Sequence, residues 1–194
     1  MEEENTEKLQ KKAERVIIFI DGSNFYHSVK ETFDLHDNQI DFRKLIHILK
    51  SGRLLVGVYY YNAALDIKYN KEVYWKQQKF FADLRKIPGF NVILASMRKV
   101  VRNNGKVEYT VKGDDIYLGI DMVSLAYEDQ YDTAILVSGD GDFAPAVKRV
   151  QKLGKKVENA YFEVSRSSLL KQVCNKSIFL DDVVEKECIK EKNN

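Results

Sequence analysis

The chain has 194 residues, of which 44% are hydrophobic and 31% are charged. This size and composition fit one compact α/β or α+β domain, and they exclude a multidomain protein as the default interpretation. Two cysteines, Cys174 and Cys188, are too few for a disulfide scaffold and lack the spacing of a zinc site. Because there is no long apolar run and the first residues are charged, we expect a cytoplasmic protein without membrane contact.

Short apolar runs alternate with amphipathic segments along the chain. The runs, rich in β-branched residues, predict buried strands at 16–20, 54–61, 91–95, 133–138, 156–162 and 177–180. The segments between them predict helices at 23–33, 41–50, 68–87, 115–128, 142–153 and 166–174. Residues 97–111 predict a small hairpin that turns at Asn104-Gly105. The alternation predicts an α/β fold, a three-layer sandwich with a mostly parallel central sheet.

Both ends of the chain are polar. Residues 1–14 are rich in Glu and Lys, and residues 186–194 contain few apolar side chains, so we expect both ends to be frayed or weakly helical. The predicted organisation is a charged N-terminal extension at 1–14, a domain at 15–184 and a polar C-terminal tail at 185–194.

Charge is segregated along the chain, although the net charge is only +2. Between Gly113 and Asp142 there are eight acidic residues and no Lys or Arg. Basic residues flank this segment on both sides: Arg98, Lys99, Arg102, Lys106 and Lys112 before it, and Lys148, Arg149, Lys152, Lys155 and Lys156 after it. The pattern suits a cation site with a basic rim for a polyanion, but chance clustering of surface charges would produce the same pattern.

Acidic residues follow two of the predicted strands. The first strand ends in Asp21-Gly22-Ser23-Asn24, and the strand at 133–138 leads into Ser138-Gly139-Asp140-Gly141-Asp142. In an open parallel sheet, ligands bind at the carboxyl ends of the strands, so these segments are expected to meet there. The helix at 115–128 would add Asp115 and Asp121 to them.

A cluster of carboxylates without His or Cys suits a hard divalent cation such as Mg²⁺ or Mn²⁺. Each acid also has a structural explanation, because Asp21 could belong to a turn, and Asp115 or Asp142 could cap a helix. Spacing alone leaves open whether Asp114 or Asp115 belongs to the site. The joint placement of acids at several element ends favours a site.

The segments that carry this pattern are Asp21-Gly-Ser-Asn24, Lys112-Gly-Asp-Asp115-Ile, Asp121, Ser138-Gly-Asp140-Gly-Asp142-Phe143 and Gly154-Lys-Lys-Val. Together they resemble the NYN domain, the LabA-like branch of the PIN-like metal-dependent ribonuclease superfamily, from about Val16 to about Val183. The resemblance implies a PIN-like/NYN fold with an acidic site made of Asp21, Asp115, Asp121, Asp140 and Asp142, and with Asn24 beside it. Asp114 departs from the family pattern, which most often has an apolar residue there.

The resemblance implies a metal-dependent ribonuclease in which Mg²⁺ or Mn²⁺, held by these acids, activates a water molecule for phosphodiester hydrolysis. Asn24 would orient that water or a phosphate oxygen, and Ser138 would steady the carboxylate loop. Since some NYN relatives are thought to bind RNA or assemble complexes without cutting, a non-catalytic RNA-binding or complex-forming module is the alternative.

RNA is the expected partner, single-stranded rather than structured. The residues predicted to neutralise its phosphates are Arg98, Lys99, Arg102, Lys112, Lys148, Arg149 and Lys152. Tyr59, Tyr60, Tyr61 or Trp75 could stack on a base, but tyrosines of a buried strand and a tryptophan on a helix are more often core residues. The preference for RNA over DNA, endo- or exonuclease polarity and homo-oligomer formation are left open by the sequence.

Overall fold

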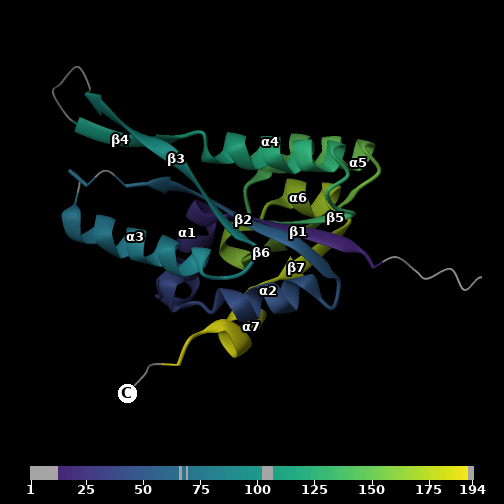
Figure 1. Ribbon diagram of the computed structural model, residues 1–194, viewed down its shortest axis with the longest axis horizontal. Helices are drawn as coiled ribbons and strands as arrows, with labels where there is room; N and C mark the ends of the chain where they lie inside the picture. Colours follow the sequence, from purple (N-terminus) through teal and green to yellow (C-terminus); the bar gives the residue numbers. More distant parts are fainter. Residues whose placement is uncertain (1–12, 66, 69, 102–106, 192–194) are drawn as a thin grey trace, which may run out of the picture.

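The computed structural model describes residues 13–65, 67–68, 70–101 and 107–191, with the backbone alone at 96–101 and 107–112. Its centre is a seven-stranded sheet in the order β4-β3-β2-β1-β5-β6-β7 (Figure 1). Six strands are parallel, and β4 runs antiparallel to β3 at the sheet edge. The strands are β1 (Arg15–Asp21), β2 (Leu54–Ala64), β3 (Phe90–Val101), β4 (Val107–Lys112), β5 (Thr133–Val137), β6 (Lys156–Tyr161) and β7 (Lys176–Phe179).

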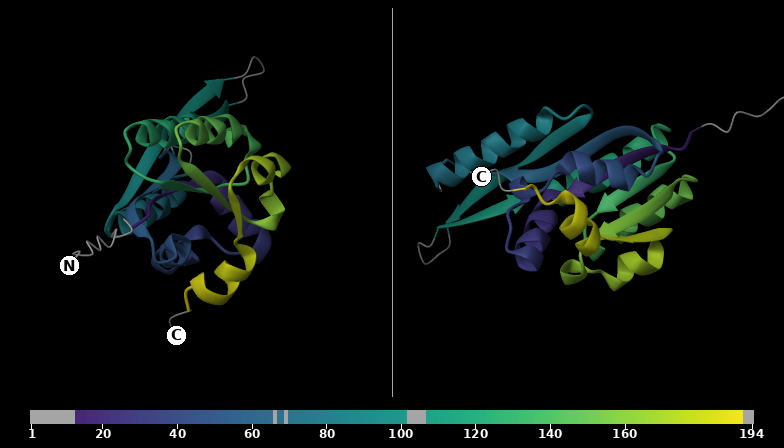
Figure 2. Two further views of the ribbon diagram at one scale, coloured as in Figure 1. Left: turned by 90° about the vertical axis from the view of Figure 1, so that its right-hand side faces the viewer. Right: turned by 90° about the horizontal axis from the view of Figure 1, so that it is seen from below.

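Helices cover both faces of the sheet. One face packs against α1 (Gly22–Phe33), α2 (Phe42–Lys50), α3 (Lys71–Arg85) and α7 (Asp181–Val183), seen from below in Figure 2. The other face packs against α4 (Asp114–Tyr127), α5 (Ala144–Lys152) and α6 (Ser168–Val173). Short 3₁₀ turns lie at Asp37–Gln39, Gly141–Phe143 and Glu163–Ser165, and a π-helical turn at Val184–Cys188. The predicted three-layer α/β sandwich is confirmed.

The central strand shows why the sequence produces these layers. Every residue of β1 from Val16 to Asp21 is buried, because both faces of the strand are covered. Ile17 and Phe19 belong to the core beneath α4 and α5, whereas Ile18 and Ile20 belong to the core beneath α1 and α2. A continuous apolar run is therefore required here, in place of the polar–apolar alternation of a half-exposed strand.

The predicted strand at 91–95 and the first arm of the predicted hairpin form one continuous strand, β3. Its first half pairs in parallel with β2, and its second half pairs antiparallel with β4, with Met97 opposite Val111. The sequence between the two parts contains no Gly or Pro that would break the strand. The turn predicted at Asn104-Gly105 lies outside the described residues.

Two further boundaries differ from the prediction. The helix predicted from 142 begins as a 3₁₀ turn and becomes α-helical at Ala144, where Pro145 occupies the first turn. The predicted polar tail contributes to the core, because Cys188 is fully buried and Ile189 forms a β-bridge with Ile40. A single apolar pair within a polar run has no periodicity that would reveal this packing.

Across the described ranges, no helix is both long and apolar enough to cross a membrane.

Candidate active site

The carboxyl ends of β1 and β5 lie side by side, because the two strands are hydrogen-bonded neighbours with Ile20 opposite Val137. The next residues of the two strands are therefore also neighbours. The Ser138 hydroxyl donates to Asp21 Oδ2 at 2.9 Å and accepts a hydrogen bond from the Asp140 backbone N–H at 3.0 Å. Ser138 thus makes the hydrogen bonds expected of a residue that steadies the carboxylate loop.

Asn24 connects the same two loops. Its backbone N–H donates to Asp21 Oδ1 at 3.0 Å, which makes Asp21 the N-cap of α1. Its side-chain Oδ1 accepts a hydrogen bond from the Gly139 N–H at 3.0 Å. The Asn24 amide nitrogen donates to no other residue in the described part of the chain, so it is available to a ligand.

The β5 loop is held from behind by close backbone packing. A Cβ atom at Gly139 would lie 1.8 Å from the Ser165 carbonyl oxygen, so only glycine fits at this position. Asn159, buried in β6, donates its side-chain N–H groups to the carbonyl oxygens of Leu136 at 3.2 Å and Ser138 at 2.8 Å. The loop that carries Asp140 and Asp142 is therefore fixed in place by the neighbouring strand and the loop after it.

The start of α4 brings two more acids to this edge of the sheet. Asp114 Oδ2 accepts a hydrogen bond from the Ser23 hydroxyl at 3.4 Å. The negative charges of Asp114, Asp140 and Asp142 act on Asp115, and those of Asp114 and Asp115 act on Asp21. Which of the two would bind a metal stays open, because the charges of both Asp114 and Asp115 act on Asp21. We call Asp21, Asp114, Asp115, Asp140 and Asp142 the acidic cluster.

Burial and crowding raise the pKa of two members of the acidic cluster, Asp21 and Asp115. Asp21 is only 6% exposed, and burial raises its pKa to about 6, against the lowering effect of the hydrogen bonds from Asn24 and Ser138. The pKa of Asp115 is also raised, first by burial and then by the neighbouring carboxylates. Among the described side chains, no Lys or Arg forms an ion pair with the cluster. The cluster is thus short of positive charge.

Asp121 is not brought into the acidic cluster. Its Oδ2 accepts the Tyr61 hydroxyl at 2.9 Å, and its charge acts on Tyr59 and Tyr61. The pKa of Tyr61 is raised by burial and then by Asp121. Asp121 lies two helical turns after Asp114, and its carboxylate faces Tyr61 of β2.

Asp140, rather than Asp142, is the capping residue of this loop. The sequence offers Asp142 as a helix cap, but Asp140 Oδ1 accepts the Asp142 N–H at 2.9 Å and caps the 3₁₀ turn at Gly141–Phe143. The extra 3₁₀ turn before α5 moves the capping position two residues toward the strand. Asp142 itself is exposed beside Asp115.

The described residues do not form a ready-made metal site. Within the described ranges, no three His, Cys, Asp or Glu side chains lie close enough together to hold a metal ion. All side-chain donors of the acidic cluster are oxygens, as hard divalent cations require.

The predicted basic rim is only partly described. Lys148, Arg149 and Lys152 are exposed on α5. Because α5 runs away from the acidic loop, Lys152 lies about 15 Å from Asp142 along the helix axis. Arg98, Lys99 and Lys112 lie on β3 and β4, where the backbone alone is described, and Arg102 lies outside the described residues. Tyr60 and Tyr61 are buried, as expected of core residues, and Trp75 is 56% exposed.

Sequence reasoning missed several residues that support the site. Asn159 is the one with a visible signal, since it is a polar residue in the middle of an apolar strand. Ser23, Tyr61 and Ser165 carry no such signal, because their roles depend on which loops meet in space.

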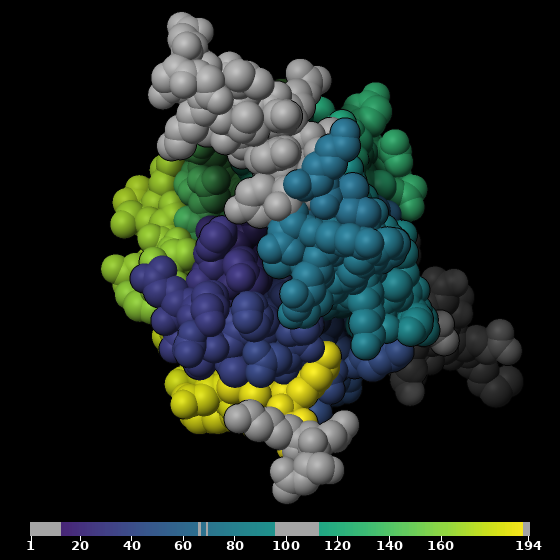
Figure 3. Space-filling model, turned by 90° about the vertical axis from the view of Figure 1, so that its left-hand side faces the viewer, coloured from purple at the N-terminus to yellow at the C-terminus, as the bar shows by residue number. Residues whose placement is uncertain are grey.

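Figure 3 views the molecule from the side at which the parallel strands end, with α1 (purple) near the centre and α3 (teal) beside it.

Fold and site together define an α/β domain with acidic residues at the carboxyl edge of a parallel sheet. The family model of the NYN domain matches residues 15–181, and the chain belongs to this family. The NYN domain is part of the PIN-like nuclease superfamily. PIN-like nucleases generally use divalent metals, and NYN nucleases generally act on RNA.

One solved structure supports the fold assignment. A protein of unknown function from Vibrio parahaemolyticus is 27% identical with a TM-score of 0.69, covering 89% of this chain and 96% of that chain. MurG of Acinetobacter baumannii is 8% identical with a TM-score of 0.41, covering 92% of this chain and 47% of that one, and it carries no argument about function. No curated protein matches the chain.

Proposed function

We propose that this protein is a divalent-metal-dependent ribonuclease of the LabA-like branch, with the acidic cluster as its catalytic site. The observation that supports this most is that five carboxylates from three separate elements lie at one edge of the sheet, where their charges act on Asp21 and Asp115, without a basic partner among the described residues. A purely structural cluster of this kind would lower stability, because like charges repel one another. A bound cation would remove that cost.

The residues present fit Mg²⁺ or Mn²⁺ held by one or two carboxylates and several waters, which is the usual coordination of these ions. Asp21, Asp140 and Asp142 would hold the ion, together with Asp115. A bound metal would make the attacking water more acidic and would neutralise charge on the scissile phosphate. In this proposal Asp121 is a positioning residue, because its contact with Tyr61 holds α4 against β2.

The other residues of the site orient the reactants. The Asn24 amide nitrogen would donate to the attacking water or to a phosphate oxygen, while its Oδ1 fixes the Gly139 loop. Ser138 keeps Asp21 and the Asp140 backbone in register. A cytoplasmic location and a possible homo-oligomer stay predictions.

The alternative is a non-catalytic RNA-binding or complex-forming module. One observation favours it: among the described residues, no three potential ligands converge as a preformed metal site. RNA that is bound but left uncut in the presence of Mn²⁺ would support this alternative.

Cleavage by an Asp140→Asn variant tests the proposal. Asn keeps the shape and can still accept the Asp142 N–H, but it removes one charge from the acidic cluster. We expect the rate of RNA cleavage with Mn²⁺ to fall by about two orders of magnitude or more, and RNA affinity to stay level or rise. The measurement is cleavage of a labelled single-stranded and a structured RNA, with and without chelator.

The matched control is Asp182→Asn, an exposed carboxylate on α7 on the far side of the domain from α4 and α5. It should cleave at the wild-type rate. An Asp140→Asn protein of high purity that also cleaves at the wild-type rate would remove the acidic cluster from the mechanism.

A further inference from the structure

A cavity of about 790 Å³ lies next to the acidic cluster. Ser23, which donates to Asp114, forms part of its wall, so the cavity and the cluster share a boundary. The remaining wall comes from α1, the turn after it, the end of β2 and the first half of α3. A volume of this size accommodates a nucleoside.

The wall of this cavity combines aromatic and amide groups. The rings of Tyr26 and His36 are stacked, with centroids 6.0 Å apart and an interplanar angle of 24°. Asn62 and Gln77 bring side-chain amides to the same cavity. Asp37 is held there by the Tyr60 hydroxyl at 3.2 Å. Flat rings that stack and amides that hydrogen-bond are the groups with which proteins bind unpaired bases.

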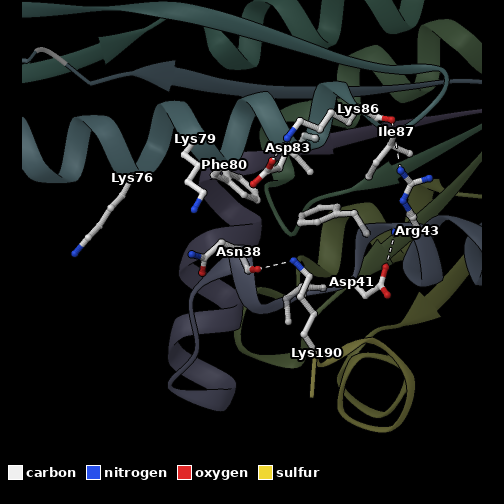
Figure 4. A pocket seen from close by; sticks show the side chains of 13 residues that line it. Asn38, Asp41, Arg43, Lys76, Lys79, Phe80, Asp83, Lys86, Ile87 and Lys190 are labelled. Atoms are coloured by element: carbon white, nitrogen blue, oxygen red, sulfur yellow. Dashed lines mark hydrogen bonds and ion pairs between the residues drawn. The ribbon is translucent and has the colours of Figure 1, made fainter. Parts of the chain in front are cut away.

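A second hollow, of about 620 Å³, continues from the first between α2 and α3 (Figure 4). The two share Asn38, Lys76 and Phe80 as lining residues, so they adjoin each other. Five cationic side chains line this second part, which we call the basic groove: Arg43, Lys76, Lys79, Lys86 and Lys190. Figure 4 shows Lys79 of α3 pointing toward Asn38, which faces Lys190.

The acids of the basic groove do not neutralise it. Asp41 caps α2 by accepting the backbone N–H groups of Arg43 and Lys44, and Asp83 pairs with Lys86 at 2.7 Å. Lys190 donates to the Asn38 carbonyl oxygen at 2.7 Å, which fixes its ammonium group at the groove without a carboxylate partner. Within the described part of the chain, Arg43, Lys79 and Lys190 form no ion pair.

We infer that a single RNA strand runs from the acidic cluster, past Tyr26 and His36, into the basic groove between α2 and α3. This inference rests on the proposed function, and it names the surface that would hold the substrate. A base would occupy the cavity, and the phosphates beyond it would meet Arg43, Lys79 and Lys190. The path differs from the predicted rim on α5, whose cations lie on the opposite face of the sheet.

The salt dependence of RNA binding tests this path. In the triple variant Arg43→Gln, Lys79→Gln and Lys190→Gln, loss of three phosphate contacts should make the log–log salt slope shallower by about 2, and lower the affinity about tenfold or more. The probe is a labelled 12-nucleotide oligouridylate in chelator, so that binding is measured without cleavage. The matched control, Lys148→Gln, Arg149→Gln and Lys152→Gln, removes the same charge from α5 and should keep the wild-type slope.

Two further variants test the basic groove and the cavity beside Tyr26 separately. Lys79→Glu alone disrupts no hydrogen bond of a described residue, and it should still weaken binding while leaving the unfolding midpoint unchanged. Tyr26→Leu should lower the affinity about fivefold or more without changing the salt slope, because stacking is not an ionic contact.

The outcomes distinguish this inference from the proposed function. Groove-dependent binding without cleavage under Mn²⁺ would support the path and overturn the nuclease. Cleavage that persists while the groove variant binds RNA with the wild-type slope would support the nuclease and overturn the path. A slope that flattens in the α5 variant instead would move the RNA to α5. Tighter binding of polyglutamate than of RNA at the groove would overturn RNA as the occupant.

Discussion

Asp21 has two roles that oppose each other energetically. As the N-cap of α1 it accepts the Asn24 N–H, and as an acid of the site it is held nearly out of water beside Asp114 and Asp115. The cap stabilises the helix, whereas the buried charge destabilises the fold. The buried charge of Asp21 thus lowers the stability of the fold at the position where a cation would bind.

The stability of Asp21→Asn should reveal this cost. The pKa of Asp21 is raised from its ordinary value near 4 to about 6, so the folded protein binds the proton more tightly than the unfolded chain. In chelator, the contribution of Asp21 to the free energy of unfolding should be highest below pH 4 and should fall by roughly 3 kcal/mol as the pH rises through about 6.

Asn at position 21 can still accept the Asn24 N–H but carries no charge. The variant should therefore be more stable than the wild type at pH 8 and about equal to it at pH 4, as measured by urea unfolding at each pH. Equal stability at pH 8 would show that the buried charge costs nothing.

At the scale of elements, the chain places its chemistry on loops that rigid strands position. The sequence revealed the acids at the ends of β1 and β5 because strand ends are marked by Gly and Asp after apolar runs. It did not reveal that Asp121 pairs with Tyr61, because the direction of a side chain two turns into a helix depends on how that helix docks. The capping role of Asp140 depends on one short 3₁₀ turn, which propensities do not resolve.

Substitution of Gly139 tests how tightly the β5 loop is held, and Gly119 of α4 provides a comparison. Gly139→Ala would place a methyl group 1.8 Å from the Ser165 carbonyl oxygen, so the loop would have to move. We expect a loss of about 1–3 kcal/mol in the free energy of unfolding, together with weaker cleavage. Gly119→Ala, in the middle of α4, meets only Ala146 Cβ at 3.9 Å, and should stabilise the protein by about 0.5–1 kcal/mol.

Urea unfolding of both variants gives the comparison directly. If Gly139→Ala were as stable as the wild type, the loop would not be wedged against Ser165, and the fixed position of Asp140 would lose its explanation.

At the scale of the whole molecule, the basic groove illustrates what a sequence alone cannot show. Its cations come from residues 43, 76–86 and 190, three segments with ordinary surface charge that lie far apart along the chain. The basic rim, by contrast, was predicted because its basic residues cluster in the sequence. The predicted domain limits of 15–184 stay a prediction. The packed part of the chain extends beyond residue 184, because Cys188 is fully buried.

The two hydrophobic cores of the whole molecule determine whether the fold depends on a metal ion. Two hydrophobic cores, one on each face of the sheet, contain fully buried side chains such as Phe19, Phe25 and Leu136. Neither core contains the acidic cluster, so burial of apolar surface holds the fold together without an ion. Zn²⁺ should not be required for folding, and removal of divalent ions by a chelator should leave the far-ultraviolet circular dichroism spectrum of the protein unchanged.

Mn²⁺ should nevertheless stabilise the folded protein, because it binds the folded acidic cluster and not the dispersed carboxylates of the unfolded chain. At a free concentration of one hundred times its dissociation constant, the gain is about 2.7 kcal/mol, which corresponds to a rise of roughly 5–10 °C in the unfolding midpoint. Asp140→Asn should show a smaller rise, and Asp182→Asn the full rise, when each is melted with and without Mn²⁺. An equal rise in all three proteins would place the ion outside the acidic cluster, whereas unfolding by chelator alone would show that a metal is structural.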